Sequence, residues 1–282
     1  DDGNYMMVMK YAEQGSLRKL LDSKYNDLSW RHKIDNLYYI AKGLAAIHRA
    51  NLVHKDFHSG NIVNENMYSS YITDFGLCRP VSQDSSSEEI FGVLPYIAPE
   101  VLYGKKYTEK SDIYSFGIIM SEVFTGYPPY HDISHDLSLA TQICLGRRPE
   151  IRCKVPQLLL DLMNKCLDAE PQSRPTAEVL VNNLDQFYKD LRNNKTELYK
   201  QVEEIKNLSK NSSIHDQTNQ IKSTRFHYQT HKQAIYTSRS LNFQKLPKPV
   251  NAGISQNICL KFIVQRIKLL KSSALNTFFI LS

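Results

Sequence analysis

Between residues 30 and 49, apolar side chains recur at intervals of three and four positions. This period places them on one face of a helix, so the pattern predicts a helix that buries one stripe. Ser29, directly before the stripe, is of a residue type that readily caps a helix N-terminus. The sequence therefore predicts a helix over 30–49 that begins after Ser29.

Shorter elements are predicted on both sides of this helix. An apolar run at 5–10 predicts a buried strand, and the polar residues after it lead into a short helix at 17–21. Two brief apolar runs at 62–63 and 71–73 are separated by polar residues, which is typical of a small hairpin. The first part of the chain therefore mixes helices with short strands.

The middle of the chain is predicted to be helical as far as about residue 190. A strongly apolar stretch at 112–124 indicates a buried helix, with Ser111 as its cap and Gly126 as its stop signal. The expected fold class is α+β, mainly α.

The chain changes character after residue 190. Residues 191–208 continue an amphipathic pattern and are expected to extend the last helix. From 209 to about 257 there are too few apolar residues for a core, which predicts a flexible segment. The C-terminal residues mix Ile, Leu and Phe with basic residues, and a poorly packed terminus is favoured over an amphipathic helix on a membrane. We therefore expect a globular domain at 1–190 and, at 191–282, a helical extension with a largely disordered tail.

Charge supports the same division. Residues 1–190 carry 20 Lys and Arg against 25 Asp and Glu, whereas residues 191–282 carry 15 against 4. The basic residues of the second part are spaced singly, so a solvated tail is favoured over a binding patch. We expect no nucleic-acid partner, and only weak contact of this tail with acidic surfaces. No apolar run is long enough to span a bilayer.

Cysteine usage indicates the compartment. The five Cys are scattered, with no C-x-x-C spacing, which supports neither a disulfide framework nor a zinc site. A reducing intracellular, cytoplasmic location fits best. The chain begins with Asp rather than Met, inside apolar sequence, so we expect an upstream segment.

Three polar residues around the predicted hairpin form a candidate catalytic site. Asp56 and Asn61 lie five positions apart in the loop before the hairpin, and Asp74 follows its second strand. One short hairpin therefore carries Asn61 at its entry and Asp74 at its exit. A carboxylate and an amide oxygen suit a hard cation such as Mg²⁺, which also binds phosphate oxygens. Asp56 is separate from this pair and could accept a proton from a hydroxyl nucleophile.

These residues belong to a larger set that resembles a known family. The order His54-x-Asp56-x-x-x-x-Asn61, Asp74-Phe-Gly and Ala-Pro-Glu100 is similar to the catalytic half of eukaryotic protein kinases. Segments 92–97, 111–117 and 171–176 also resemble the pattern of this family. The resemblance covers about residues 4–188. The residues of these motifs are most similar to those of the tyrosine-kinase-like group of serine/threonine kinases. It implies the large lobe of a kinase that uses ATP and Mg²⁺ to phosphorylate protein hydroxyl groups.

The resemblance also implies roles for individual residues. Asp56 would be the catalytic base, Asn61 and Asp74 the Mg²⁺ ligands, and Val63 the floor under the adenine. Four residues of the opening segment would form the hinge of the ATP site: Met9 as gatekeeper, Lys10 and Ala12 at the adenine edge, and Ser16 near the ribose.

Further roles implied by the resemblance are structural. His54 would brace the catalytic loop, and Asp112 would hold the backbone of this loop. Glu100 would form a buried ion pair with Arg174. For Ser85, Ser86 and Ser87, a solvated loop and a phosphorylated activation segment both remain open.

Three positions depart from the family pattern. Lys55 replaces the usual Arg, and an ammonium group does not grip a phosphate bidentately as a guanidinium does. His58 stands where serine/threonine kinases have the Lys that contacts the transferred phosphate, and Val93 stands where they have Thr. The acceptor, Ser/Thr or Tyr, is therefore left open.

The glycine-rich loop of the family is missing from the sequence. No G-x-G-x-x-G occurs, and no room remains for the strand Lys that contacts the phosphates. We therefore expect hinge and large lobe without the small lobe. The favoured interpretation is a piece of an active protein kinase, which is inactive by itself. The alternative is a catalytically inactive scaffold or binding module.

Overall fold

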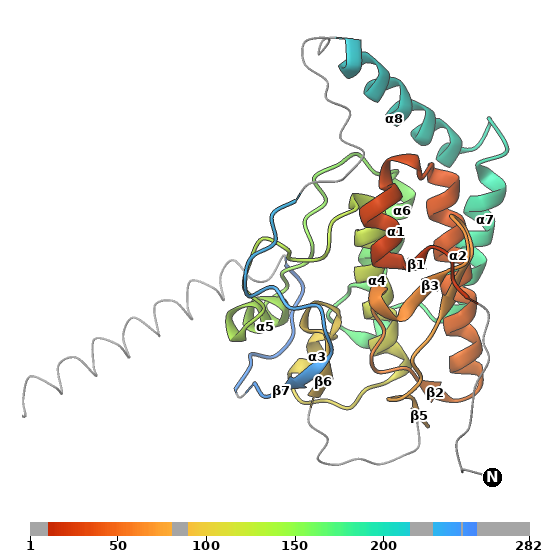
Figure 1. Ribbon diagram of the computed structural model, residues 1–282. Coiled ribbons are helices and arrows are strands. Elements are labelled where there is room, and N and C mark those ends of the chain that lie inside the picture. Colours follow the sequence, from red (N-terminus) through yellow and green to blue (C-terminus); the bar gives the residue numbers. More distant parts are fainter. Residues whose placement is uncertain (1–10, 81–89, 215–227, 244, 253–282) are drawn as a thin grey trace, which may run out of the picture.

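The computed structural model describes residues 11–80, 90–214, 228–243 and 245–252, and Figure 1 shows how their elements are arranged. The described part is mainly helical, as expected. Its helices are α1 (Leu17–Lys24), α2 (Trp30–Arg49), α3 (Pro99–Leu102), α4 (Glu109–Thr125), α5 (Leu137–Cys144), α6 (Gln157–Cys166), α7 (Ala177–Asp190) and α8 (Glu197–Ile214). Its strands are β1 (Gly15–Ser16), β2 (Leu52–Val53), β3 (Ile62–Asn64), β4 (Ser70–Ile72), β5 (Arg79–Pro80), β6 (Ile90–Gly92) and β7 (Arg239–Leu241). The strand expected at 5–10 lies outside the described residues.

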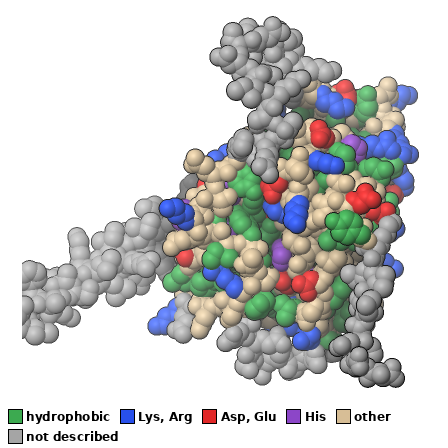
Figure 2. All heavy atoms as spheres, viewed as in Figure 1, with side chains coloured by type: hydrophobic (Ala, Val, Ile, Leu, Met, Phe, Trp, Pro, Cys, Tyr) green, Lys and Arg blue, Asp and Glu red, His purple; other side chains and the backbone are tan. Residues whose placement is uncertain are grey.

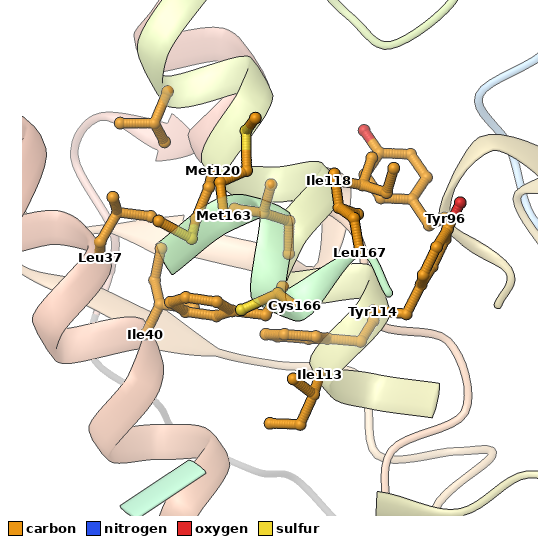
Figure 3. Close-up of a cluster of buried hydrophobic side chains, with 14 of the residues drawn as sticks. Leu37, Ile40, Tyr96, Ile113, Tyr114, Ile118, Met120, Met163, Cys166 and Leu167 are labelled. Atoms are coloured by element: carbon orange, nitrogen blue, oxygen red, sulfur yellow. The ribbon is translucent and has the colours of Figure 1, made fainter. Parts of the chain in front are cut away.

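The core lies between α2, α4, α6 and α7. Helix α4 is buried along almost its whole length, α6 packs on one side of it, and α2 lies between α4 and α7 (Figure 1). Figure 3 shows side chains of three of these helices meeting in one cluster, with Ile40 from α2, Ile118 from α4 and Met163 from α6. Burial of such side chains is the main stabilising contribution of the lobe. The packed core thereby holds in place the elements that carry the candidate site residues.

Helix α2 has the bounds that its hydrophobic period predicts. Ser29 Oγ accepts a hydrogen bond from the backbone N–H of His32, and the His32 ring accepts one from the N–H of Ser29. This reciprocal pair is a capping box, which satisfies donors that a helix start leaves free. The prediction of Ser29 as the cap is confirmed.

Helix α4 begins three residues before the predicted start. Thr108, rather than Ser111, is the N-cap, and Ser111 Oγ accepts a hydrogen bond from the Thr108 N–H at 3.1 Å. The helix ends at Gly126, whose φ of 78° is left-handed and favours glycine. A Cβ on Gly117 would lie 2.9 Å or less from side-chain atoms of Cys166 and Leu167, so this glycine permits the close packing of α6.

Short antiparallel strands position the loops rather than form a layer of the fold. Strands β1, β3 and β4 make one sheet, in which the hairpin of β3 and β4 pairs Ile62 with Ile72. Strand β2 pairs with β5, and β6 pairs with β7. The hairpin predicted from the sequence is present, and its second strand begins one residue earlier than expected.

The segment after α7 differs from the expectation of an extended helix and a flexible tail. The chain leaves the helical path after Asp190, and α8 is a separate helix that buries Leu198 and Val202. Residues 228–243 and 245–252 lie on the lobe, where Leu241 and Leu246 are buried. Few apolar side chains suffice here because this segment packs on an existing core instead of forming its own. The C-terminal residues 253–282 lie outside the described part.

The surface in view carries no single concentration of charge. Figure 2 shows Lys and Arg side chains interspersed with Asp and Glu over this face of the lobe. Within the described residues, no helix is both long and apolar enough to cross a membrane.

Candidate active site

The loop between β2 and β3 carries two of the three predicted catalytic residues, Asp56 and Asn61. Asp112, near the start of α4, accepts hydrogen bonds from the backbone N–H groups of His54 at 2.9 Å and Lys55 at 3.2 Å. The His48 ring contacts the same carboxylate at 3.0 Å. Because Lys55 has a left-handed φ of 70°, the two N–H groups can turn toward one side chain. The first turn of a buried helix therefore fixes the course of this loop.

The buried His54 side chain supports the loop from inside the protein. It is fully buried, its Nε2 lies 3.1 Å from the carbonyl oxygen of Thr73, and its ring contacts the rings of Phe57 and Phe75. Phe75 is 53% exposed, and its ring lies 5.7 Å from the His54 ring, centroid to centroid. The site thereby joins the loop to the strand before Asp74.

Asp56 points into the centre of the site and is 7% exposed. Its Oδ2 accepts hydrogen bonds from Asn61 Nδ2 at 3.3 Å and from Ser238 Oγ at 2.6 Å. Burial by itself would raise the pKa of Asp56, but hydrogen bonds with His58 and Ser238 outweigh burial and hold this pKa below its ordinary value. The carboxylate is therefore ionised at neutral pH and available to accept a proton.

His58 lies beside Asp56, at the position where the resemblance implies a phosphate-contacting group. Its Nε2 is 3.6 Å from Asp56 Oδ1, and its Nδ1 accepts a hydrogen bond from the N–H of Gly60 at 3.1 Å. The Nδ1 contact places the ring proton of a neutral His58 on Nε2. His58 therefore directs an N–H toward the carboxylate and toward Ser238.

The two predicted metal ligands lie on the same hairpin. The backbone oxygen of Asn61 accepts hydrogen bonds from Thr73 N at 2.8 Å and Thr73 Oγ1 at 3.0 Å, which fixes Asp74 next to the loop. Because Asn61 Nδ2 donates to Asp56, its amide oxygen is the atom left for a cation. Asp74 is exposed and has a left-handed φ of 60°. An amide oxygen and an exposed carboxylate are chemically suited to Mg²⁺.

The residues expected around the adenine are described in part. Ser16 in β1 pairs directly with Val63 in β3, so the structure brings these two together. Ala12 lies in the turn before β1, where its carbonyl oxygen accepts a hydrogen bond from Gly15 N at 3.0 Å. Met9 and Lys10 lie outside the described residues, as do Ser85, Ser86 and Ser87.

Glu100 and Arg174 form a bidentate ion pair beneath the site. Arg174 Nη1 and Nη2 donate to the two carboxylate oxygens of Glu100, each at 2.7 Å, and Arg174 is 1% exposed. The same guanidinium donates to the carbonyl oxygens of Asp168 and Lys110, each at 2.8 Å. This pair ties α3, which follows the activation segment, to the chain before α7.

Glu122 is a buried acid that the sequence analysis did not single out. Its carboxylate accepts hydrogen bonds from Arg18 at 2.9 Å, Ser59 at 3.1 Å and the Tyr96 hydroxyl. Burial raises the pKa of Glu122 to about 7, against the attraction of Arg18. The group joins α1, the catalytic loop and α4, so its ionisation affects the support of the site.

Replacing Glu122 by Gln should change how stability depends on pH. A pKa raised from 4.5 to about 7 means that ionisation of Glu122 opposes folding, so stability falls across that window as pH rises and is constant above it. Gln does not ionise. We expect the difference in unfolding free energy, variant minus wild type, to rise by roughly 2 kcal/mol from about pH 5 to pH 8. Urea denaturation at each pH measures this difference. Parallel pH profiles would contradict this, and Asp22→Asn, which alters the other acid beside Arg18, is the control.

Ser238 is the residue of the site that the sequence analysis missed. It lies 182 positions after Asp56, in the segment expected to be flexible, yet its hydroxyl makes the 2.6 Å contact with the Asp56 carboxylate. No local pattern marks this serine among the many of the second part. The pairing of β7 with β6 and the contacts of neighbouring residues bring it to the site.

Comparison with known proteins identifies the family to which this chain belongs. The sequence pattern of the family described as "Protein tyrosine and serine/threonine kinase" matches residues 1–184. The chain belongs to this protein kinase family. The resemblance inferred from the motifs is therefore confirmed.

Individual relatives carry kinase names. A probable serine/threonine-protein kinase of Dictyostelium discoideum is 34% identical over 195 residues, which cover 67% of this chain and 18% of the relative. The MDIS1-interacting receptor like kinase 2 of Arabidopsis thaliana is 35% identical over 189 residues, covering 61% of this chain and 18% of the relative. The chain thus spans less than a fifth of the length of these relatives.

Proposed function

We propose that this chain is the large lobe of a protein kinase that transfers the γ-phosphate of ATP to serine or threonine hydroxyl groups of proteins. The observation that carries the proposal is the 2.6 Å hydrogen bond from a serine hydroxyl to the ionised Asp56. A general base must lie within this reach of the proton that it removes. The serine/threonine names of the relatives support the same acceptor class.

The residues of the chain divide the work of the reaction. Asp56 orients the acceptor hydroxyl and takes its proton, while Asn61 Nδ2 steadies the carboxylate. His58 directs its Nε2–H at the same place, where other kinases of this type use Lys. Mg²⁺, bound by Asn61 and Asp74, would neutralise charge on the phosphates of ATP. Ser16 and Val63 would contact the nucleoside.

The 282 residues alone should transfer no measurable phosphate. Positioning and charge neutralisation carry most of this reaction, and the sequence contains no glycine-rich loop over the phosphates. The assay is radiolabelled transfer from ATP to a basic protein, with this chain and with the chain fused to the ATP-binding lobe of a related kinase. Each form is compared with its Asp56→Asn variant.

The two candidate functions differ in this assay. Transfer by the fused protein alone, lost in Asp56→Asn, supports the kinase. Absence of transfer from a folded fusion would favour the alternative, a scaffold or binding module that holds kinase substrates without turnover. Robust transfer by the chain alone, lost in Asp56→Asn, would contradict the requirement for a second lobe.

The intracellular location stays a prediction from cysteine usage.

A further inference from the structure

Residues 228–243 and 245–252, here called the strap, cross the front of the candidate active site. In Figure 1 the strap runs past α5 to β7, which lies beside β6 and α3. Strands β6 and β7 are antiparallel, with Gly92 opposite Arg239 and Ile90 opposite Leu241. Because β6 ends two residues before the η3 turn that carries Tyr96, the strap adds a strand to the activation segment. Strand addition of this kind is a common way of binding an extended peptide.

The residue before this ladder reaches the catalytic base. Ser238 Oγ donates to Asp56 Oδ2 at 2.6 Å and lies 3.3 Å from His58 Nε2. The backbone pairing and the hydroxyl contact therefore coincide at neighbouring residues. A loop that contacted the carboxylate by chance would not be expected to form an antiparallel ladder with β6 as well.

One side of the strap is held by the segment between α4 and α5. His135 N donates to the carbonyl oxygen of Gln233 at 3.0 Å, and the ring of His135 packs edge-on against Tyr236 at 4.9 Å. Arg239 donates to the carbonyl oxygen of His135 at 2.8 Å. The Tyr236 hydroxyl donates to the carbonyl oxygen of Pro129 at 2.9 Å. These contacts fix the backbone before Ser238 and at the residue directly after it.

The other side of the strap is held by α5 and by the turn after α6. Leu241 and Leu246 are buried against the core. Val250 N donates to the carbonyl oxygen of Cys144 at 2.9 Å, and Asn251 Oδ1 accepts from Ala169 N at 2.8 Å. The stretches before and after Ser238 are therefore both held by hydrogen bonds and buried side chains, and these noncovalent contacts keep Ser238 next to Asp56.

We propose that the strap is an intramolecular ligand of the protein-substrate groove, which places Ser238 at the phosphoacceptor position and is released when Ser238 carries a phosphate. This inference rests on the proposed kinase function, since the acceptor position is defined by Asp56. While the strap is bound, no other peptide can pair with β6 or bring a hydroxyl to Asp56. The strap thus competes with other protein substrates for the site until Ser238 is phosphorylated.

Phosphorylation of Ser238 uses a nucleoside triphosphate as donor. A bond forms between Ser238 Oγ and the γ-phosphorus, and the bond from that phosphorus to the β,γ-bridging oxygen breaks. The nucleoside diphosphate leaves, and the hydroxyl proton passes to the base. The product carries close to two negative charges. Because the Oγ lies 2.6 Å from an ionised carboxylate, the negative phosphate repels Asp56. The ester oxygen also no longer carries the hydrogen that the Ser238 hydroxyl donates to Asp56.

The test compares three forms of the whole 282-residue chain: wild type, Ser238→Asp and Ser240→Asp. Ser240 lies in β7, two residues after Ser238, is exposed and is paired with Phe91, so it is the matched control for added charge. The readouts are hydrogen exchange of the amides in β6 and β7, and binding of two labelled peptides with the sequence of residues 228–243. One peptide carries serine at 238 and the other phosphoserine. Thermal melting verifies that each form is folded.

We expect Ser238→Asp to raise amide exchange in β7 about tenfold or more and to bind the serine peptide at least about tenfold tighter than wild type does, equivalent to about 1.4 kcal/mol. Ser240→Asp should behave as wild type. The phosphoserine peptide should bind about tenfold more weakly than the serine peptide. If Ser238→Asp does not fold, the two peptides are compared on Ser238→Ala, which removes the hydrogen bond without adding charge.

Equal exchange in Ser238→Asp and Ser240→Asp, or equal affinity for the two peptides, would overturn the proposal. None of these readouts requires phosphate transfer. Failure of the strap and failure of the proposed kinase activity are therefore separate results.

Discussion

Replacing Asp74 by Asn is expected to lower Mg²⁺-dependent phosphate transfer by at least about 100-fold with little change in stability. The carboxylate supplies the negative charge of the proposed metal site, and an amide leaves Asn61 without a charged partner ligand. Asp74 is exposed and has a left-handed φ of 60°. Asn tolerates this backbone conformation well, so the substitution removes charge and preserves the turn.

The measurement is initial transfer rate against Mg²⁺ concentration, in the chain fused to an ATP-binding lobe. Asp161→Asn on the exposed face of α6 makes the same chemical change away from the site and is the control. Near-normal turnover by a folded Asp74→Asn variant would remove Asp74 from the metal site. An equal loss in Asp161→Asn would show that the assay reports general damage.

Breaking the pair of Glu100 and Arg174 should destabilise the lobe strongly. Each single substitution to Ala leaves a buried, uncompensated charge, which costs about 3–5 kcal/mol of unfolding free energy. The double variant should lose much less than the sum, because neither charge then remains. Arg174 also donates to two carbonyl oxygens, so its single variant should be the worse of the two.

A double-mutant cycle measured by urea denaturation gives the coupling directly. The control is the exposed pair of Asp185 and Lys189 on α7, which is 2.6 Å apart and whose side chains are 41% and 63% exposed. Its coupling should be far smaller than that of Glu100 and Arg174, because water screens exposed charges. Additive losses at Glu100 and Arg174 would show that burial does not strengthen their pairing.

Local sequence signals determined the elements whose causes are local. The helix at 30–49 was predicted with its bounds because a continuous apolar stripe and a capping serine both lie within the segment. The start of α4 was placed three residues late, since Thr108 and Ser111 both favour a cap and together form one capping box. The motifs likewise located the loop with Asp56 and Asn61 and the residue Asp74.

The resemblance implied that Asp112 holds the backbone of the loop, and the hydrogen bonds from His54 and Lys55 to Asp112 agree with this. No motif pointed to the buried Glu122, whose contact with Ser59 joins α4 to a residue more than fifty positions earlier. Composition was also a poor guide to residues 228–243 and 245–252, which were expected to be flexible. A segment with few apolar residues cannot form a core, but it can be ordered by an existing one.

The sequence by itself determined the family, the helices with continuous stripes and the residue types of the catalytic loop, because each of these is written in neighbouring positions. Only the tertiary structure decided that Ser238 meets Asp56, that the strap pairs with β6, and that Glu122 is buried beside Arg18. These contacts join residues about 100 to 180 positions apart. Their free energy comes from packing and pairing across the fold, which no local period encodes.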